Sequence, residues 1–320
     1  MKRKIFCLIT AIYFLYILPV AACAVQTLIP VGKVVGLELK GDQVTVAAFD
    51  ESANAQKAGV QVGDRLLSID GQPIRNAQDV SKALQQSKGS VKLLVQRGDS
   101  LSTIRVSPII TKDGPKLGVY LRQGVTGIGT VTYYDPQSKN FGILGHGVNE
   151  AGGKLLALTA GNVYQAKVSS VRNGRCGEPG QLIGALISQE PIAEIRRNTA
   201  QGVFGSGKLP FSAQALPVGT SDTVKTGEAT ILSTIAGEDV QEYSVEILKI
   251  YPASRQNGRN LLIRVTDPRL LETTGGIVQG MSGSPIIQNG HLIGAVTHVL
   301  VNDPTTGYGI FIENMLDAAA

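Results

Sequence analysis

One short stretch of the chain combines the residue types that nucleophilic catalysis requires. Residues 279–285 read Gln-Gly-Met-Ser-Gly-Ser-Pro and lie between two apolar runs. This composition predicts a tight loop between two β-strands, in which Gly280 and Gly283 let the chain turn sharply. A nucleophilic serine needs such a loop, because its hydroxyl must be exposed and backbone amides must converge on the developing oxyanion. Ser282 is therefore the candidate nucleophile, although an ordinary Gly/Ser turn explains the same residues.

The base for this serine must come from another part of the chain. A serine hydroxyl is a poor nucleophile until a base removes its proton, and imidazole titrates in the right range. His146 lies in an apolar run with a glycine on each side of it, and we predict that it is this base. Of the other two histidines, we expect His291 to be exposed on a hairpin and His298 to be a satisfied core or edge residue.

Both residues belong to a longer set of motifs. The set comprises Leu-Gly-His-Gly at 144–147, Asp-Pro at 267–268, Gly-Gly-Ile-Val-Gln-Gly-Met-Ser-Gly-Ser-Pro-Ile at 275–286, Gly-Ala-Val-Thr-His-Val at 294–299, Asn-Asp-Pro at 302–304 and Gly-Tyr-Gly-Ile at 307–310. From about residue 116 to residue 315 the chain resembles the stage IV sporulation protein B family of serine peptidases. Ser282 also stands where chymotrypsin-type peptidases keep their nucleophile, which implies an oxyanion hole made by the amides of Gly280 and Ser282.

The carboxylate that would orient His146 is left open by the residues themselves. No aspartate occurs between His146 and Ser221, where chymotrypsin-like folds usually supply it, and the carboxylates there are Glu150, Glu178, Glu190 and Glu194. The family resemblance implies Asp267, shortly before the serine, with Asp222 in reserve. Asp-Pro is also a frequent strand-ending turn, so a purely structural role for Asp267 is the alternative.

A second module is predicted before the peptidase motifs. Residues 58–74 resemble the central signature of PDZ domains, and residues 76–84 read as an amphipathic helix. PDZ domains bind peptide C-termini or internal segments as an added strand between a strand edge and a helix. The resemblance implies that Val80 and Leu84 line this groove. It implies that the carboxylate loop and receiving edge are formed by Val34, Val35, Gly36 and Leu37. A PDZ fold that only packs against the peptidase is the alternative.

Composition sets the fold class. Of 320 residues, 43% are hydrophobic and 17% are charged, which is typical of a globular chain, and 38 glycines with short apolar runs favour β-structure. We predict a mainly β protein with an export or anchor segment at 1–25, a PDZ domain at 26–110 and a peptidase domain at 111–320. The peptidase domain is expected to be a chymotrypsin-like double β-barrel, with its active site in the cleft between the barrels.

The N-terminal segment predicts export. Lys-Arg-Lys at 2–4 precedes an uncharged run at 5–25, which fits an uncleaved anchor, a cleaved signal peptide or a lipoprotein signal acylated at Cys23. Cys176 is then the single cysteine of the body, and we expect it to be structural. No clustered metal-ligand motif occurs, so we predict neither a metal nor a cofactor. No basic stripe with interleaved aromatics occurs, so nucleic acid is not an expected partner.

The family resemblance implies a role in sporulation signalling. The chain would be secreted from the forespore into the space between two membranes, cleave itself near its N-terminus, and release a membrane-associated regulatory complex from inhibition, which activates a mother-cell sigma factor. Two alternatives remain open: a non-catalytic, membrane-tethered PDZ adaptor, and a general quality-control protease. In the latter class the PDZ module usually follows the catalytic domain.

Overall fold

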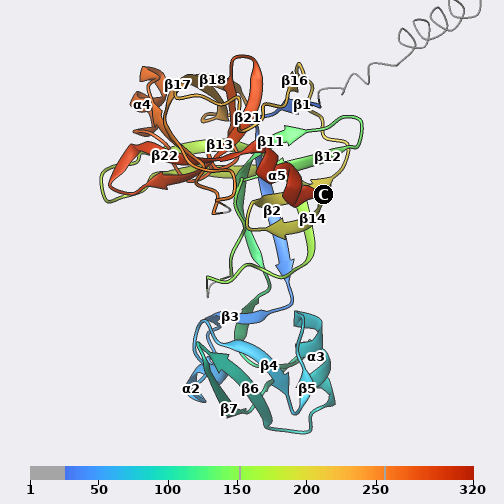
Figure 1. Ribbon diagram of the computed structural model, residues 1–320. Helices are drawn as coiled ribbons and strands as arrows, with labels where there is room; N and C mark the ends of the chain where they lie inside the picture. The colour runs from blue at the N-terminus through green and yellow to red at the C-terminus, as the bar shows by residue number, and fades with distance from the viewer. Residues whose placement is uncertain (1–25, 151–152, 256) are drawn as a thin grey trace, which may run out of the picture.

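The structure is a computed structural model that describes residues 26–150, 153–255 and 257–320. Figure 1 shows a larger β-rich body and a smaller body, joined by two long strands, β2 and β11. The predicted export segment, with Cys23, lies outside the described residues. Within the described ranges, no helix is long and apolar enough to cross a membrane.

The first barrel of the larger body closes through six strands. Their order is β12 (Asn140–Ile143), β15 (Gly202–Ser206), β14 (Gln181–Thr199), β13 (Leu158–Arg172), β2 (Val34–Gly41) and β11 (Val125–Tyr134), and β11 also pairs with β12. Two short strands, β1 (Thr27–Pro30) and β16 (Leu216–Pro217), extend the sheet beyond β11. The interior is filled by fully buried side chains such as Val131, Phe141 and Ile143. Burial of this apolar surface is the main force that closes the barrel.

The second barrel is built from the C-terminal half of the chain. Its six strands, in sheet order, are β17 (Gly227–Thr234), β18 (Val240–Ile250), β19 (Leu261–Val265), β22 (Asp303–Phe311), β21 (His291–Leu300) and β20 (Pro285–Gln288). In β18, Tyr243, Val245 and Ile247 alternate inward with period two and are buried. Helix α4 (Pro268–Thr274) follows β19, and α5 (Ile312–Ala319) packs on β21 and β22. The predicted double-barrel fold is confirmed.

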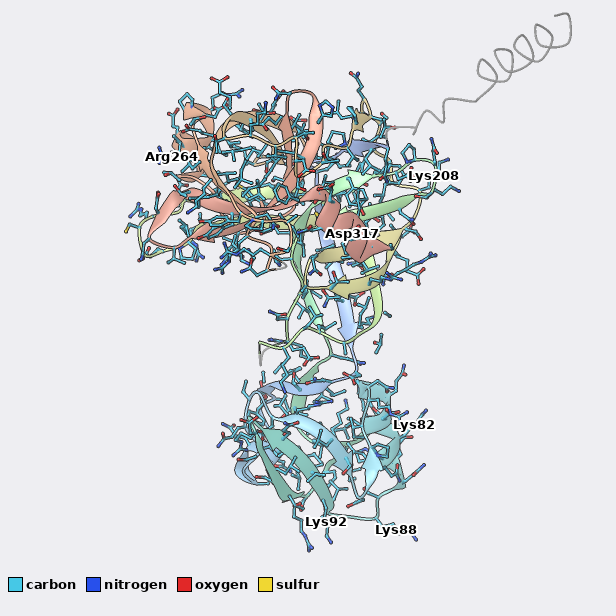
Figure 2. The ribbon with its side chains drawn as sticks, viewed as in Figure 1. Lys82, Lys88, Lys92, Lys208, Arg264 and Asp317 are labelled. Carbon is cyan, nitrogen blue, oxygen red and sulfur yellow. The ribbon has the colours of Figure 1, made fainter. Side chains whose placement is uncertain are left out.

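The smaller body is the PDZ module. Its sheet has the order β10 (Val119–Arg122), β3 (Val44–Phe49), β4 (Arg65–Ile69), β6 (Val91–Arg97) and β7 (Ser100–Val106), with β5 (Gln72–Pro73) on β4. A small hairpin, β8 (Ile109–Thr111) and β9 (Gly114–Lys116), and helices α2 (Asn54–Lys57) and α3 (Ala77–Gln86) complete it. Figure 2 shows Lys88 and Lys92 at the end of the module remote from the barrels, and Lys82 on its flank.

Helix α3 begins as its sequence predicts. The side chain of Asn76 accepts a hydrogen bond of 2.9 Å from the amide of Asp79, which satisfies one of the free donors of the first turn. Val80, Ala83 and Leu84 form the buried face and pack into the module's own core. The predicted amphipathic helix is therefore present at nearly the predicted position.

The PDZ module is inserted into a hairpin of the first barrel, which corrects both its predicted bounds, 26–110, and its predicted peptide-binding residues. Strand β2 pairs with β11 along one edge and with β13 along the other. Val34, Val35, Gly36 and Leu37 therefore belong to the barrel, and they have no free edge on which a peptide could add. The PDZ sheet begins only at β3 and ends with β10, so the module leaves the barrel after β2 and returns to it at β11.

This insertion predicts that the barrels fold without the PDZ module. Leu39 pairs directly with Val125 across the base of the insertion, so a two-residue turn can join the strands. Replacing residues 42–122 by Asn-Gly should preserve the near-ultraviolet circular dichroism signal of the barrels and a cooperative thermal transition. Loss of cooperative unfolding would show instead that the module is part of the barrel's folding unit.

Candidate active site

The loop that carries Ser282 is bent by glycines in the left-handed region. Gly280 has φ of 102° and Gly283 has φ of 96°, values that L side chains rarely adopt. A Cβ on Gly283 would lie 2.0 Å from the carbonyl oxygen of Thr130. Glycine is therefore required at 283, both for the turn and for the close approach of the first barrel to the serine loop.

Thr130 fastens the serine loop to the first barrel. Its amide donates to the carbonyl of Ser282 at 3.1 Å, and its hydroxyl donates to the carbonyl of Gly280 at 2.8 Å. The hydroxyl group is fully buried with its residue, so these bonds are shielded from competing water. The second barrel contributes a further bond, from the amide of Gly283 to Val296 at 2.7 Å. The loop is thus held from both barrels at once.

His146 follows strand β12 in a sharply turned segment. Leu144 and Gly145 have φ of 71° and 67°, so two successive residues in the left-handed region turn the chain toward the cleft. The ring nitrogen Nδ1 lies 2.9 Å from the carbonyl of Gly147. A carbonyl only accepts hydrogen bonds, so Nδ1 must carry the proton and Nε2 must hold the lone pair. This is the tautomer that a general base requires.

The structure brings the predicted base and nucleophile into one cleft between the barrels. The cleft has a volume of about 460 Å³, and both His146 and Ser282 line it. Its walls are mostly apolar and come from β2 and β11 of the first barrel and from the second barrel: Leu37, Leu39, Val125, Ile128, Val278 and Val299. Burial lowers the pKa of His146 from its ordinary value, so the ring is neutral and able to accept a proton.

The serine hydroxyl is held in a resting position. Ser282 Oγ donates a hydrogen bond of 2.8 Å to the carbonyl oxygen of Thr297. A carbonyl cannot take the proton away, so attack on a substrate requires the hydroxyl to turn toward His146. Neither the amide of Gly280 nor that of Ser282 donates to any other described residue. Both predicted oxyanion-hole donors are therefore free to bind a substrate oxygen.

Asp267 has a different task from the one predicted for it. It is the N-cap of α4, and its carboxylate accepts from the Arg269 amide at 2.9 Å and from the guanidinium at 2.8 and 3.1 Å. The Ser244 amide also donates to it, at 3.3 Å. The hydrogen bonds from Arg269 lower the pKa of Asp267 to about 2. Asp267 does not line the cleft, so the structure does not bring it to His146.

No other acid takes its place among the described residues. The cleft lining contains no aspartate or glutamate. The alternatives weighed from the sequence, Asp222, Glu178, Glu190 and Glu194, are all exposed, and Glu150 lines a separate polar cavity against the PDZ module. The carbonyl of Gly147 occupies the position on Nδ1 that a triad carboxylate would take. It fixes the tautomer of His146, but it carries no full charge to stabilise the imidazolium.

Comparison with known protein families decides the class of this site. The profile of the SpoIVB peptidase S55 family matches residues 113–316, which span both the His146 and the Ser282 motifs. The chain belongs to the SpoIVB peptidase S55 family. A PDZ domain profile matches residues 45–97, within the inserted module. Membership of the S55 family makes the chain a serine peptidase, and the predicted family resemblance is confirmed.

Individual relatives match only parts of the chain. A putative zinc metalloprotease of Rhizobium meliloti is 33% identical over 114 residues, which is 35% of this chain and 29% of that protein. A putative zinc metalloprotease of Clostridium perfringens is 36% identical over 70 residues, or 22% of this chain and 21% of that one. The chain therefore spans less than a third of either relative's length.

Solved structures show a distant likeness. The Rv3671c protease of M. tuberculosis matches in its active form with a TM-score of 0.36 and 16% identity, over 61% of this chain and 73% of that one. Its inactive form matches with a TM-score of 0.35 and 17% identity, over 61% of this chain and 85% of that one.

The S55 site contains two residues that were not predicted to belong to it, His298 and Thr130. His298 was expected to be a satisfied core or edge residue, yet it lines the cleft beside His146, and its Nδ1 is buried without a hydrogen-bond partner. Burial, followed by the effects of His146 and Arg259, lowers the pKa of His298 to about 4. Thr130 carried no sequence signal, because a threonine in an alternating strand is unremarkable until its partners are known.

The two hydrogen bonds from Thr130 to the serine loop, called the Thr130 clamp below, can be tested with a matched pair of variants. Thr130→Val removes the hydrogen bond to Gly280 and leaves a partly buried carbonyl unpaired, which should cost about 1 kcal/mol and lower kcat/KM at least tenfold by loosening the loop. Thr132→Val is the control, because the buried hydroxyl of Thr132 on the same strand has no hydrogen-bond partner. That control should be neutral or stabilising. Equal kinetics for the two variants would show that the clamp does not position Ser282.

The placement of Asp267 predicts a structural phenotype. In Asp267→Asn the amide oxygen can still cap α4, but the charge that pairs with Arg269 is lost. We expect the free energy of unfolding to fall by about 1 kcal/mol, while kcat/KM of the folded enzyme stays within a few-fold of wild type. A loss of a hundredfold or more in kcat, at unchanged stability, would return Asp267 to the role of triad acid.

Because His146 is buried, we predict that activity falls only at a pH below the usual pKa of histidine. The folded-state pKa of His146 lies below its usual 6.5, so the active neutral form persists at pH 6.5 and disappears only as the pH falls through that lower value. The logarithm of kcat/KM for a peptide substrate, measured from pH 4 to 8, should therefore fall only below pH 6.5. Circular dichroism at each pH would separate this effect from unfolding. A half-maximal rate above pH 7 would contradict the assignment.

Proposed function

We propose that this S55 peptidase is an endopeptidase of sporulation signalling that acts outside the cytoplasm. It would be exported from the forespore into the intermembrane space, cleave itself, and cleave a regulatory membrane protein so that a mother-cell sigma factor becomes active. Support comes from the family to which the chain belongs and from the predicted export segment. The observation that carries the peptidase chemistry is the presence of His146 and Ser282 in one cleft.

The geometry supports an acyl-enzyme mechanism. Ser282 leaves its bond to Thr297, and His146 Nε2 takes the hydroxyl proton as Oγ bonds to the peptide carbonyl carbon. The amides of Gly280 and Ser282 hold the resulting oxyanion. His146 then gives the proton to the departing amine as the C–N bond breaks. Water, deprotonated by the same ring, releases the acyl group and restores Ser282.

The cleft supports a preference for apolar substrate segments. Its walls are aliphatic, and no charged side chain lines it among the described residues. A charged side chain entering this space would lose its hydration without gaining a partner, which is unfavourable. We therefore propose that apolar residues flank the bond that is cut.

The PDZ module would present targets to this cleft through strand β10. Strand β10 lies at one edge of the module's sheet, and no other described strand pairs with its outer side. Helix α3 packs against β9, the strand that leads directly into β10, so a groove between β10 and α3 would fit an added peptide strand. Tyr120 on β10 is 61% exposed. In this proposal β10 takes the role that the sequence assigned to Val34, Val35, Gly36 and Leu37.

Self-cleavage by the purified full chain, kept in mild detergent, tests the proposal. The wild-type protein should shorten from its N-terminal side on incubation, and both Ser282→Ala and His146→Ala should remain intact. Mixing wild type with tagged Ser282→Ala shows whether cleavage occurs between molecules. Identical behaviour of all three proteins, at matched circular dichroism spectra, would support the non-catalytic adaptor. Indiscriminate digestion of an unfolded protein would favour a quality-control protease.

A further inference from the structure

A second imidazole lies against the base in the active-site cleft, and the mechanism does not use it. His298, on β21, places its ring centre 5.2 Å from that of His146, with the ring planes inclined by 39°. Its Nδ1 is buried and has no hydrogen-bond partner. A buried, unpaired nitrogen is costly, so such a group calls for an explanation.

The spacing of the two rings fits a shared metal ion. Two imidazoles that bind one tetrahedral Zn²⁺ through nitrogens at about 2.0–2.1 Å have ring centres roughly 5 Å apart. His146 is already arranged as metal-binding histidines usually are, because its Nδ1–H is held by the carbonyl of Gly147 and its Nε2 lone pair points elsewhere. Imidazole nitrogen favours Zn²⁺ and Cu²⁺ over the harder Mg²⁺ and Ca²⁺.

The surroundings set the character of such a site. Among the described residues, no group of three or more His, Cys, Asp or Glu side chains could hold a metal ion. Two imidazoles alone would therefore leave positions for water or for the Ser282 hydroxyl, which lines the same cleft. A site of this kind exchanges its metal and does not serve as a permanent structural centre. Arg259, whose charge contributes to the lowered pKa of His298, lies over the ring of Tyr308.

We propose that His146 and His298 together bind Zn²⁺ reversibly, and that this binding switches the peptidase off. The metal occupies the Nε2 lone pair of His146, so that the ring can no longer accept the proton of Ser282. Inhibition rests on the assignment of His146 as the base, whereas metal binding itself does not. The sequence did not predict this site, because its two ligands lie far apart in the chain and belong to different barrels.

Direct metal binding is the first test. The full chain carrying Ser282→Ala, with Cys7, Cys23 and Cys176 replaced by serine and without a polyhistidine tag, is titrated with Zn²⁺ by calorimetry. Co²⁺ is used in parallel to give an absorption spectrum that reports coordination geometry. We expect one site with a tetrahedral Co²⁺ spectrum. His298→Phe and His298→Gln should each weaken Zn²⁺ binding at least tenfold, whereas His291→Phe, which changes the exposed histidine, should leave it unchanged.

Inhibition is the second test. Peptide hydrolysis by the cysteine-free chain with Ser282 intact should fall on addition of Zn²⁺ and recover with EDTA, while Mg²⁺ and Ca²⁺ have no effect. The Zn²⁺ concentration for half inhibition, measured on whatever activity each variant retains, should rise at least tenfold in the two His298 variants. Absence of a binding site in the Ser282→Ala chain overturns the proposal. So does Zn²⁺ binding that depends on His291 and not on His298.

Discussion

The catalytic cleft depends on the two hydrogen bonds that Thr130 makes to the serine loop. Apolar clusters pack the two barrels together: Val34, Val168 and Leu182 of the first barrel join the core of the second. The alignment of the barrels decides whether a ring from one and a hydroxyl from the other meet. Thr130 on β11 donates hydrogen bonds to the carbonyls of Gly280 and Ser282. Gly283 has no side chain, which allows the backbone of the serine loop to approach that of β11 closely. Because Thr130 itself is fully buried, these bonds are shielded from water on its side, and they help to fix how the two barrels align.

The same strand connects the cleft to the PDZ module. Strand β11 holds the serine loop at Thr130 and lines the cleft with Val125 and Ile128, and the chain enters it at Val125 directly from β10 of the module. Strand β2 lines the cleft with Leu37 and Leu39 and leads into the module from the other side (Figure 1). One wall of the cleft is therefore the pair of strands that carries the PDZ insertion. A change in the position of the PDZ module would therefore act on the cleft directly, through β2 and β11.

Local chemistry explains what the sequence could predict. Short apolar runs predicted the β-barrels, and the glycines around Ser282 and His146 predicted exposed, sharply turned loops. Both signals depend only on residues that are close together in the sequence. The PDZ helix at Asn76 was equally local. The sheet to which a strand belongs is not a local property. Residues 34–41 have the same sequence pattern whether they pair within a PDZ module or within a barrel. Only the long-range pairing with β11 and β13 decides between them.

The same reasoning explains the residues that were assigned wrongly or missed. An aspartate before a proline fits a triad acid and a helix cap equally well, and the position of Arg269 two residues later favours the cap. His298 was expected to be a satisfied core or edge residue, because its neighbour His146 comes from the other barrel and is distant in the sequence. In each case the deciding contact joins segments that are distant in sequence, and no spacing rule encodes it.

Covalent labelling tests the meeting of His146 and Ser282 most directly. A fluorophosphonate reacts with a serine only when a neighbouring base activates it, and mass spectrometry of the labelled peptide identifies the residue. One adduct is expected, on Ser282, and it should be absent from the His146→Ala protein. Ser284, which is fully buried and bonded to Ser233, should remain unlabelled. Labelling at Ser284, or labelling of Ser282 that does not depend on His146, would contradict the account.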